Sequence, residues 1–194
     1  MPAAVPEGPL ALPFDCRWGE ALLVWSPAGI HELYLPDPLA SRRRRQAPAR
    51  QPRTIADEAG ARHRPPIVSR RRAGAIARAI ADRIAGHLEG ELDDFLDLEL
   101  IYPEKATRFR LAVWEAARRV PPGLVLSYGE LAEEVGRPGA ARAVGTAMKE
   151  TPFPLLVPAH RVIGAGRRPG GWTGPGGVSR KLALLEIEGV DLLG

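Results

Sequence analysis

Residues 155–164 carry side chains from which a reactive or ligand-binding site could be built. They read Leu-Leu-Val-Pro-Ala-His-Arg-Val-Ile-Gly, so an apolar, strand-like run passes directly into a Pro-Ala-His-Arg turn. A loop rich in glycine and proline, residues 164–177, follows and holds one aromatic residue, Trp172. A buried strand that delivers a histidine and an arginine beneath such a loop is one way to build a pocket. The same pattern also fits an ordinary core strand followed by a surface loop.

Linked motifs across the second half of the chain resemble the O6-alkylguanine-DNA alkyltransferase family. Residues 158–162, Pro-Ala-His-Arg-Val, are similar to the family's Pro-Cys-His-Arg-Val signature, with alanine in place of the acceptor cysteine. Residues 127–132 and 140–145 resemble its DNA-binding helices, and residues 178–189 resemble its closing helix. The likeness is good over residues 109–189 and loose over the first hundred. Several motifs in one order are specific evidence, whereas any one alone would be weak.

The resemblance implies roles for the residues around this signature. His160 matches the base that takes the thiol proton through water, and Glu188 matches the carboxylate that holds this histidine. The nucleophile itself is absent, because Ala159 has no lone pair with which to attack an alkyl carbon. Cys16 is the only cysteine and lies far away in sequence. As written, the chain has no catalytic residue for alkyl transfer, so enzymatic activity is uncertain.

The remaining residues of the implied lesion pocket would contact a flipped base. Trp172 would stack on that base, and Thr173 could reach its edge. Arg161 is expected to pair with a carboxylate rather than with DNA. The full predicted pocket comprises Val157, Pro158, Ala159, Val162, Trp172, Thr173 and Met148.

Two explanations of Ala159 compete. If the alanine is native, the chain resembles alkyltransferase-like proteins, which bind O6-alkylguanine in flipped form and mark it for nucleotide excision repair. If it replaces a natural cysteine, the chain is an O6-methylguanine-DNA methyltransferase without its acceptor. Thr151 and Trp172 also depart from the family pattern, and the loop at residues 172–177 is about two residues longer than is common. These departures favour native loss, whereas the retained N-terminal half favours the second explanation.

The elements before the signature predict DNA binding. Residues 128–135 and 140–149 are predicted helices about a Gly-Arg-Pro-Gly break, which is a helix-turn-helix pattern. The second helix begins with small residues, so it is suited to binding shape and phosphates rather than to reading sequence. The resemblance places it in the minor groove, where Arg142 would replace the flipped nucleotide and Tyr128 would crowd the adjacent phosphate. The predicted DNA-binding residues are Tyr128, Ala140, Ala141, Arg142 and Gly145.

A transcription regulator with an N-terminal sensor domain is a second alternative. It would bind one particular operator, usually as a dimer. The alanine-rich second helix argues against it.

The first half of the chain predicts a small α/β unit. Residues 1–13 are expected to form an extended tail or edge, and residues 21–25 and 30–35 a hairpin around a Ser-Pro-Ala-Gly turn. A helix is predicted from residue 73 to about residue 90, and a short strand at residues 95–100. The expected buried stripe of the helix is Ile76, Ala79, Ile80, Arg83, Ile84 and Leu88.

An arginine-rich segment interrupts this unit. Residues 42–72 hold eleven arginines against two acidic residues, which predicts a basic, mobile insertion at about residues 41–72. The fold class expected for the whole chain is α+β. The resemblance implies an RNase H-like N-terminal domain at residues 1–102 and a mainly helical, winged helix-turn-helix domain at residues 103–194.

Composition narrows the class of partner. The chain of 194 residues has no apolar run near the roughly 20 residues of a membrane span. Its first hundred residues hold 14 basic and 14 acidic side chains, so the net charge of +4 lies in the second half, with the helix-turn-helix. His31, His63 and His87 are scattered, and we expect neither a metal nor a cofactor.

These features predict a monomer in the cytoplasm, associated with the nucleoid if the protein is bacterial. The expected partners are double-stranded DNA that contains O6-alkylguanine and nucleotide excision repair proteins.

Overall fold

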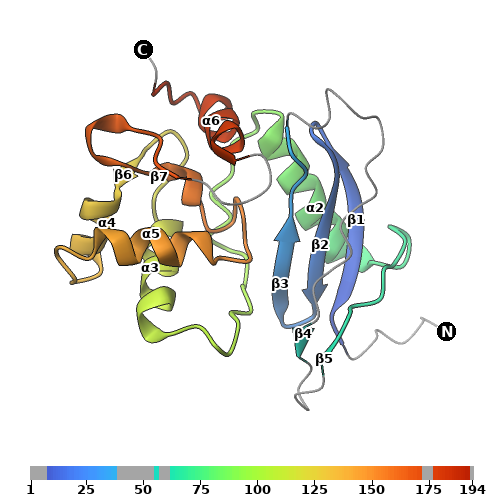
Figure 1. The fold of residues 1–194 in the computed structure, drawn as a ribbon. Helices are drawn as coiled ribbons and strands as arrows, with labels where there is room; N and C mark the ends of the chain where they lie inside the picture. Colours follow the sequence, from blue (N-terminus) through green and yellow to red (C-terminus); the bar gives the residue numbers. More distant parts are fainter. Residues whose placement is uncertain (1–7, 39–54, 57–61, 172–176, 193–194) are drawn as a thin grey trace.

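A three-stranded antiparallel sheet forms the base of the N-terminal half. The computed structural model describes residues 8–38, 55–56, 62–171 and 177–192. The sheet has the order β1 (Leu10–Cys16), β2 (Gly19–Ser26), β3 (Gly29–Tyr34) (Figure 1). The predicted hairpin is confirmed as β2 and β3. The expected extended edge is confirmed at residues 10–13, which begin the edge strand β1 and pair with β2, whereas residues 1–7 lie outside the described residues.

One helix, α2 (Gly74–Leu88), packs against β1 and β2. Ala77 and Ala81 on its buried face allow the helix to lie close to the sheet, and Ile84, His87 and Leu88 are buried at its far end. The predicted bounds are confirmed, but the predicted stripe is wrong at Ile76, which is 71% exposed, and at Ala79, which is also exposed. The stripe is rotated because the small residues Ala77 and Ala81, not the isoleucine, face the sheet.

The arginine-rich segment is anchored where it returns to the sheet. Its described parts form the short antiparallel pair β4 (Ile55–Ala56) and β5 (Arg62–His63). Further on, the Ala11 amide donates to the Pro66 carbonyl at 3.0 Å, and the Val68 amide donates to the Ala11 carbonyl at 2.9 Å. The expectation of a mobile insertion up to residue 72 is therefore wrong for residues 66–68. Residues 41–54 and 57–61 of that insertion lie outside the described residues.

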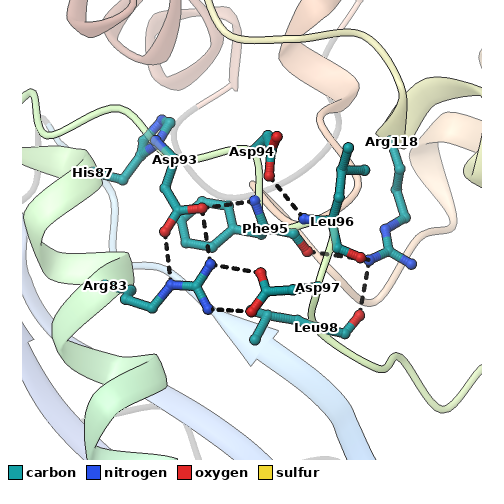
Figure 2. A network of polar contacts seen from close by, with 9 residues as sticks. All are labelled: Arg83, His87, Asp93, Asp94, Phe95, Leu96, Asp97, Leu98 and Arg118. Carbon is teal, nitrogen blue, oxygen red and sulfur yellow. Dashed lines mark hydrogen bonds and ion pairs between the residues drawn. The ribbon is translucent and has the colours of Figure 1, made fainter.

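Residues 91–99 form a loop held by side chains, not the predicted strand at residues 95–100 (Figure 2). The Arg83 guanidinium bridges the carboxylates of Asp93 and Asp97, each at 2.7 Å. The Asp93 carboxylate also accepts the Phe95 amide at 2.8 Å, and Phe95 has a positive φ of 56°. Within residues 95–100, only Leu100 forms a β-bridge, to Ile30 of β3. The alternating apolar residues therefore belong to a loop held by side-chain hydrogen bonds and not to a strand.

The C-terminal half is mainly helical and lies on the left in Figure 1, opposite the sheet. Trp114 on α3 (Arg108–Arg118) donates from its indole nitrogen to the Ala147 carbonyl of α5 (Ala141–Lys149) at 2.8 Å. A capping box formed by Ser127 and Glu130 starts α4 (Tyr128–Glu134). The helices are α3 (Arg108–Arg118), α4 (Tyr128–Glu134), α5 (Ala141–Lys149) and α6 (Gly177–Ile187). The parallel pair β6 (Leu126–Ser127) and β7 (Val162–Ile163) lies beside them, with the single turns η1 (Ala159–Arg161) and η2 (Ala165–Arg167).

The two halves share one hydrophobic core in the described residues. The Leu33 amide of β3 donates to the Pro152 carbonyl at 3.0 Å, and Arg180 of α6 donates to the Leu35 carbonyl at 2.6 Å. The boundary at residue 102 stays a prediction. None of the helices in the described residues is long and apolar enough to cross a membrane.

Candidate functional site

The Pro-Ala-His-Arg segment is a buried turn. Residues 155–157, predicted as a strand, form an irregular turn in which Leu155 has a φ of 74°. Pro154 and Pro158 flank it, and proline cannot donate to a sheet ladder, which accounts for the missing strand. The chain then makes the single turn η1 and enters β7, which pairs with β6 at the start of α4. The signature is thereby placed against the predicted DNA-binding helices.

Glu188, one residue beyond α6, organises this turn. Its side chain is fully buried and binds Arg161, which donates to it at 2.7 Å from one terminal nitrogen and at 3.0 Å from Nε. His160 donates from Nε2 to Glu188 Oε1 at 2.8 Å. Arg161 also donates to the Val120 carbonyl at 2.6 Å. The predictions that Glu188 holds His160 and that Arg161 pairs with a carboxylate agree with these contacts.

Burial and hydrogen bonds together fix the charges in this cluster. Burial would raise the pKa of Glu188, but the hydrogen bonds from His160, His87 and Arg161 outweigh it and hold that pKa well below its usual range. Burial lowers the pKa of His160 to about 4, although Glu188 opposes the shift. Glu188 is therefore ionised and His160 neutral near pH 7. Because Nε2 of His160 carries the proton, Nδ1 of the same ring is a hydrogen-bond acceptor. Nδ1 has no hydrogen-bond partner among the described residues.

Position 159 lies within this buried turn. Ala159 is 7% exposed, Val157 and Val162 are fully buried, and Met148 of α5 is buried as well. Pro158 is also buried. Trp172 and Thr173, which were predicted to contact the base, lie outside the described residues. The pocket roles of all these residues stay predictions.

Cys16 does not take the place of the missing nucleophile. It lies at the end of β1, and its thiol donates to the Gly19 carbonyl at 3.1 Å. Burial raises the pKa of the Cys16 thiol, so it is largely protonated at neutral pH.

Tyr128, the first residue of α4, is half-buried between three segments. A Cβ at Gly145 of α5 would lie 3.8 Å from its ring, and a Cβ at Gly170 would lie 3.0 Å from it. Lys181 of α6 lies 5.6 Å from the ring centroid and donates to the Val162 carbonyl at 2.5 Å. Burial lowers the pKa of Lys181 to about 8. The glycines allow the ring to sit between α5, the loop and α6.

The first turns of α5 expose small side chains and one long one. Val144, Ala147 and Met148 face the core, whereas Arg142 is exposed and Ala140, Ala141 and Gly145 are partly exposed. The predicted DNA-binding residues therefore share the first turns of α5 and the start of α4, which pack against each other. Their roles stay predictions.

Sequence reasoning missed His87 and Lys181. His87, in the last turn of α2, donates from Nε2 to Glu188 Oε1 at 3.2 Å across 101 residues of sequence. Nothing in the local pattern around either residue points to the site, because each contact is made by tertiary packing.

Comparisons with known proteins agree with this arrangement. Residues 108–190 match the family described as 6-O-methylguanine DNA methyltransferase, DNA binding domain. The chain is 46% identical over 116 residues to a methylated-DNA–protein-cysteine methyltransferase of Mycobacterium leprae, and the match covers 59% of this chain and 66% of that protein, slightly less than two thirds. It is also 46% identical over 116 residues to a DNA base-flipping protein of Thermus thermophilus, covering 60% of this chain and 76% of that protein.

The fold is similar over nearly the whole chain to that of a solved relative. The structure of Mycobacterium tuberculosis OGT in complex with DNA is 31% identical, has a TM-score of 0.66, and is matched over 92% of this chain and 91% of that one. The molecule thus has the mixed α/β fold of a DNA-binding alkyltransferase. It belongs to the methylated-DNA–protein-cysteine methyltransferase family, which confirms the family that the motifs predicted.

Proposed function

We propose that this chain recognises O6-alkylguanine in DNA without repairing it. It binds the minor groove through a helix-turn-helix made of α4 and α5, holds the alkylated nucleotide in flipped form, and flags it for nucleotide excision repair. We also propose that the N-terminal half is an RNase H-like domain and the C-terminal half a winged helix-turn-helix domain. The protein would act as a monomer on genomic DNA in the cytoplasm.

The observation that carries the proposal is Ala159 at the acceptor position of a buried turn that keeps its histidine and carboxylate. His160 and Arg161 each donate to Glu188, and all three side chains are buried, so the turn retains the base that alkyl transfer would need. A methyl side chain cannot attack the alkyl carbon, and the Cys16 thiol is held at the β1–β2 turn. A turn that keeps these contacts but has no nucleophile, together with the departures from the family pattern at Thr151 and Trp172, supports binding without transfer.

The surface of α5 supports the proposed mode of DNA binding. Its small residues allow the backbone to approach phosphates closely, and the exposed Arg142 is the long side chain of its first turns. A guanidinium can stack and hydrogen-bond where a base has left, which helps to offset the few kcal/mol that unstacking costs, on the order of one to three. The name of the T. thermophilus relative, a DNA base-flipping protein, also supports nucleotide flipping.

The alternative is an O6-methylguanine-DNA methyltransferase whose acceptor cysteine is replaced by Ala159. The intact His160–Glu188 pair favours it, as does the name of the M. leprae relative. In a methyltransferase of this kind His160 would take the thiol proton through water. The thiolate sulfur would then bond to the methyl carbon as the bond from carbon to O6 breaks, and the guanine anion left in the DNA would take up a proton. A restored thiol in the Ala159→Cys variant would then become methylated by O6-methylguanine DNA at a substantial rate.

Equilibrium binding tests the proposal. Two duplexes that differ only in guanine or O6-methylguanine at one position are titrated at the same ionic strength, because phosphate contacts make affinity depend on salt. We expect about tenfold or greater preference for the lesion, which corresponds to about 1.4 kcal/mol. Equal affinity for the two duplexes would contradict lesion recognition and leave only unspecific DNA binding.

A further inference from the structure

Glu188 has a buried partner that comes from the N-terminal half. His87 lies in the last turn of α2, is fully buried, and donates from Nε2 to Glu188 Oε1 at 3.2 Å. The same oxygen accepts the His160 hydrogen bond at 2.8 Å. One carboxylate oxygen therefore joins an imidazole of the N-terminal half to the imidazole of the signature turn.

The hydrogen bonds of His87 define its tautomer. Its Nδ1 accepts the backbone amide of Asp93 at 3.0 Å, so Nδ1 has no proton. The proton is then on Nε2, which donates to the carboxylate of Glu188. His87 is thus a neutral ring with a fixed orientation, and both of its nitrogens are used.

A second layer of contacts fixes the Asp93 amide that orients His87 (Figure 2). The Asp93 carboxylate receives two hydrogen bonds from Arg83, at 2.7 and 3.0 Å, and one from the Phe95 amide. The Phe95 ring packs at 5.4 Å from the His87 ring, and the Arg83 guanidinium lies over it at 5.6 Å. The loop that follows α2 is therefore shaped around the His87 ring.

These contacts form a continuous path from the N-terminal half to the lesion site. Arg83 binds the Asp93 carboxylate, and the Asp93 amide orients the His87 ring. His87 in turn binds Glu188. Glu188 then binds His160 and Arg161, the two residues that follow Ala159. We propose that His87 is a positioning residue of the lesion site, by which the N-terminal half fixes Glu188 and the turn that contains Ala159. The part that concerns DNA rests on the proposed function.

Two amide variants separate the roles of the two His87 nitrogens. The amide nitrogen of glutamine can stand in for Nε2 and keep the donor to Glu188, whereas His87→Asn keeps only the acceptor for the Asp93 amide. We expect His87→Gln to retain the preference for O6-methylguanine over guanine duplex and His87→Asn to reduce it about tenfold, as loss of a supporting hydrogen bond does in metal and active sites. Affinity for the undamaged duplex should be the same in both.

The role of His87 can also be tested without DNA, by NMR, so the test does not depend on whether the protein prefers the lesion. The Nε2 proton of His160, bound to a buried carboxylate, should give a downfield proton resonance in an NMR spectrum. We expect His87→Asn to shift this resonance and His87→Gln to leave it close to its position in the parent protein. Thermal unfolding of both variants confirms that each is folded.

The outcomes divide clearly. An unchanged His160 resonance in His87→Asn would overturn the proposal whatever the DNA result. If the parent protein prefers the lesion, equal lesion preference in the two variants would overturn it as well. A parent protein without lesion preference would overturn the proposed function alone, and the resonance would then decide the role of His87.

Discussion

Replacing Glu188 with glutamine tests how much the folded state depends on one carboxylate. The substitution keeps the shape of the side chain but removes its charge, and it leaves Arg161 buried without a counterion. One glutamine oxygen can still accept a hydrogen bond. The amide nitrogen, however, would then face a donor, most directly Arg161 Nε, which lies 3.0 Å from Glu188 Oε2.

The expected cost follows from burial. The side chains of Arg161 and Glu188 are 1% and 0% exposed, so solvent screens their interaction very little. Breaking a buried ion pair by removing one partner costs about 3–5 kcal/mol. This is a large part of the total stability of an ordinary domain, which is about 5–15 kcal/mol. Glu188→Gln should therefore unfold at a much lower urea concentration than the parent.

Urea unfolding at pH 7, followed by tryptophan fluorescence, measures this cost. Asp97→Asn is the matched control, because Asp97 also pairs with an arginine but its side chain is 63% exposed. The control should cost less than about 1 kcal/mol. A Glu188→Gln variant no less stable than the Asp97→Asn control would refute the view that this carboxylate holds the turn together.

Three further predictions concern DNA binding, packing and pH. Arg142→Ala should weaken binding to a lesion-containing duplex by about 1–3 kcal/mol, with unchanged thermal stability because Arg142 is exposed; equal affinity would remove this arginine from the mechanism. Gly170→Ala should destabilise the fold by about 1–2 kcal/mol, since φ is +71° and the new Cβ would lie 3.0 Å from the Tyr128 ring. Gly171→Ala, which meets no described atom within 4 Å, should be close to neutral in the same melting experiment. In the folded protein the pKa of His160 is about 4, whereas its ordinary value is 6.5. Between pH 4 and 6.5 this histidine is therefore more protonated in the unfolded chain than in the folded protein. Stability should therefore fall as pH drops from 6.5 to 4, by at most about 1.4 kcal/mol per pH unit from this group. If urea unfolding gives the same pH dependence for His160→Gln, another group is responsible.

Local patterns in the sequence predicted the elements that local chemistry specifies. The hairpin of β2 and β3 has a Pro-Ala-Gly turn, and α4 is followed by a Gly-containing break, so both could be placed correctly. The tie between His160 and Glu188 was implied by the family resemblance and is seen in the structure. Each of these depended on residues close in sequence or on a known motif.

The wrong predictions share a physical cause, which is that tertiary contacts override local pattern. The alternating residues 95–100 suggested a strand, but Arg83 pairs with Asp93, whose carboxylate accepts the Phe95 amide and stabilises a loop instead. Ile76 suggested a buried position, but alanines gave α2 a closer fit to the sheet. The contact between His87 and Glu188 spans 101 residues and has no local signal, so only the folded structure could show it.

The fate of the lesion in the bound complex tests the central claim most directly. The chain and a duplex with one O6-methylguanine are mixed at concentrations that saturate binding, incubated, and separated for mass analysis of the protein and base analysis of the DNA, with Ala159→Cys in parallel. The account predicts a tight complex from which the parent chain is recovered unmethylated and the O6-methylguanine intact. Recovery of plain guanine from the complex with the parent chain, or failure to form a lesion-dependent complex, would contradict it.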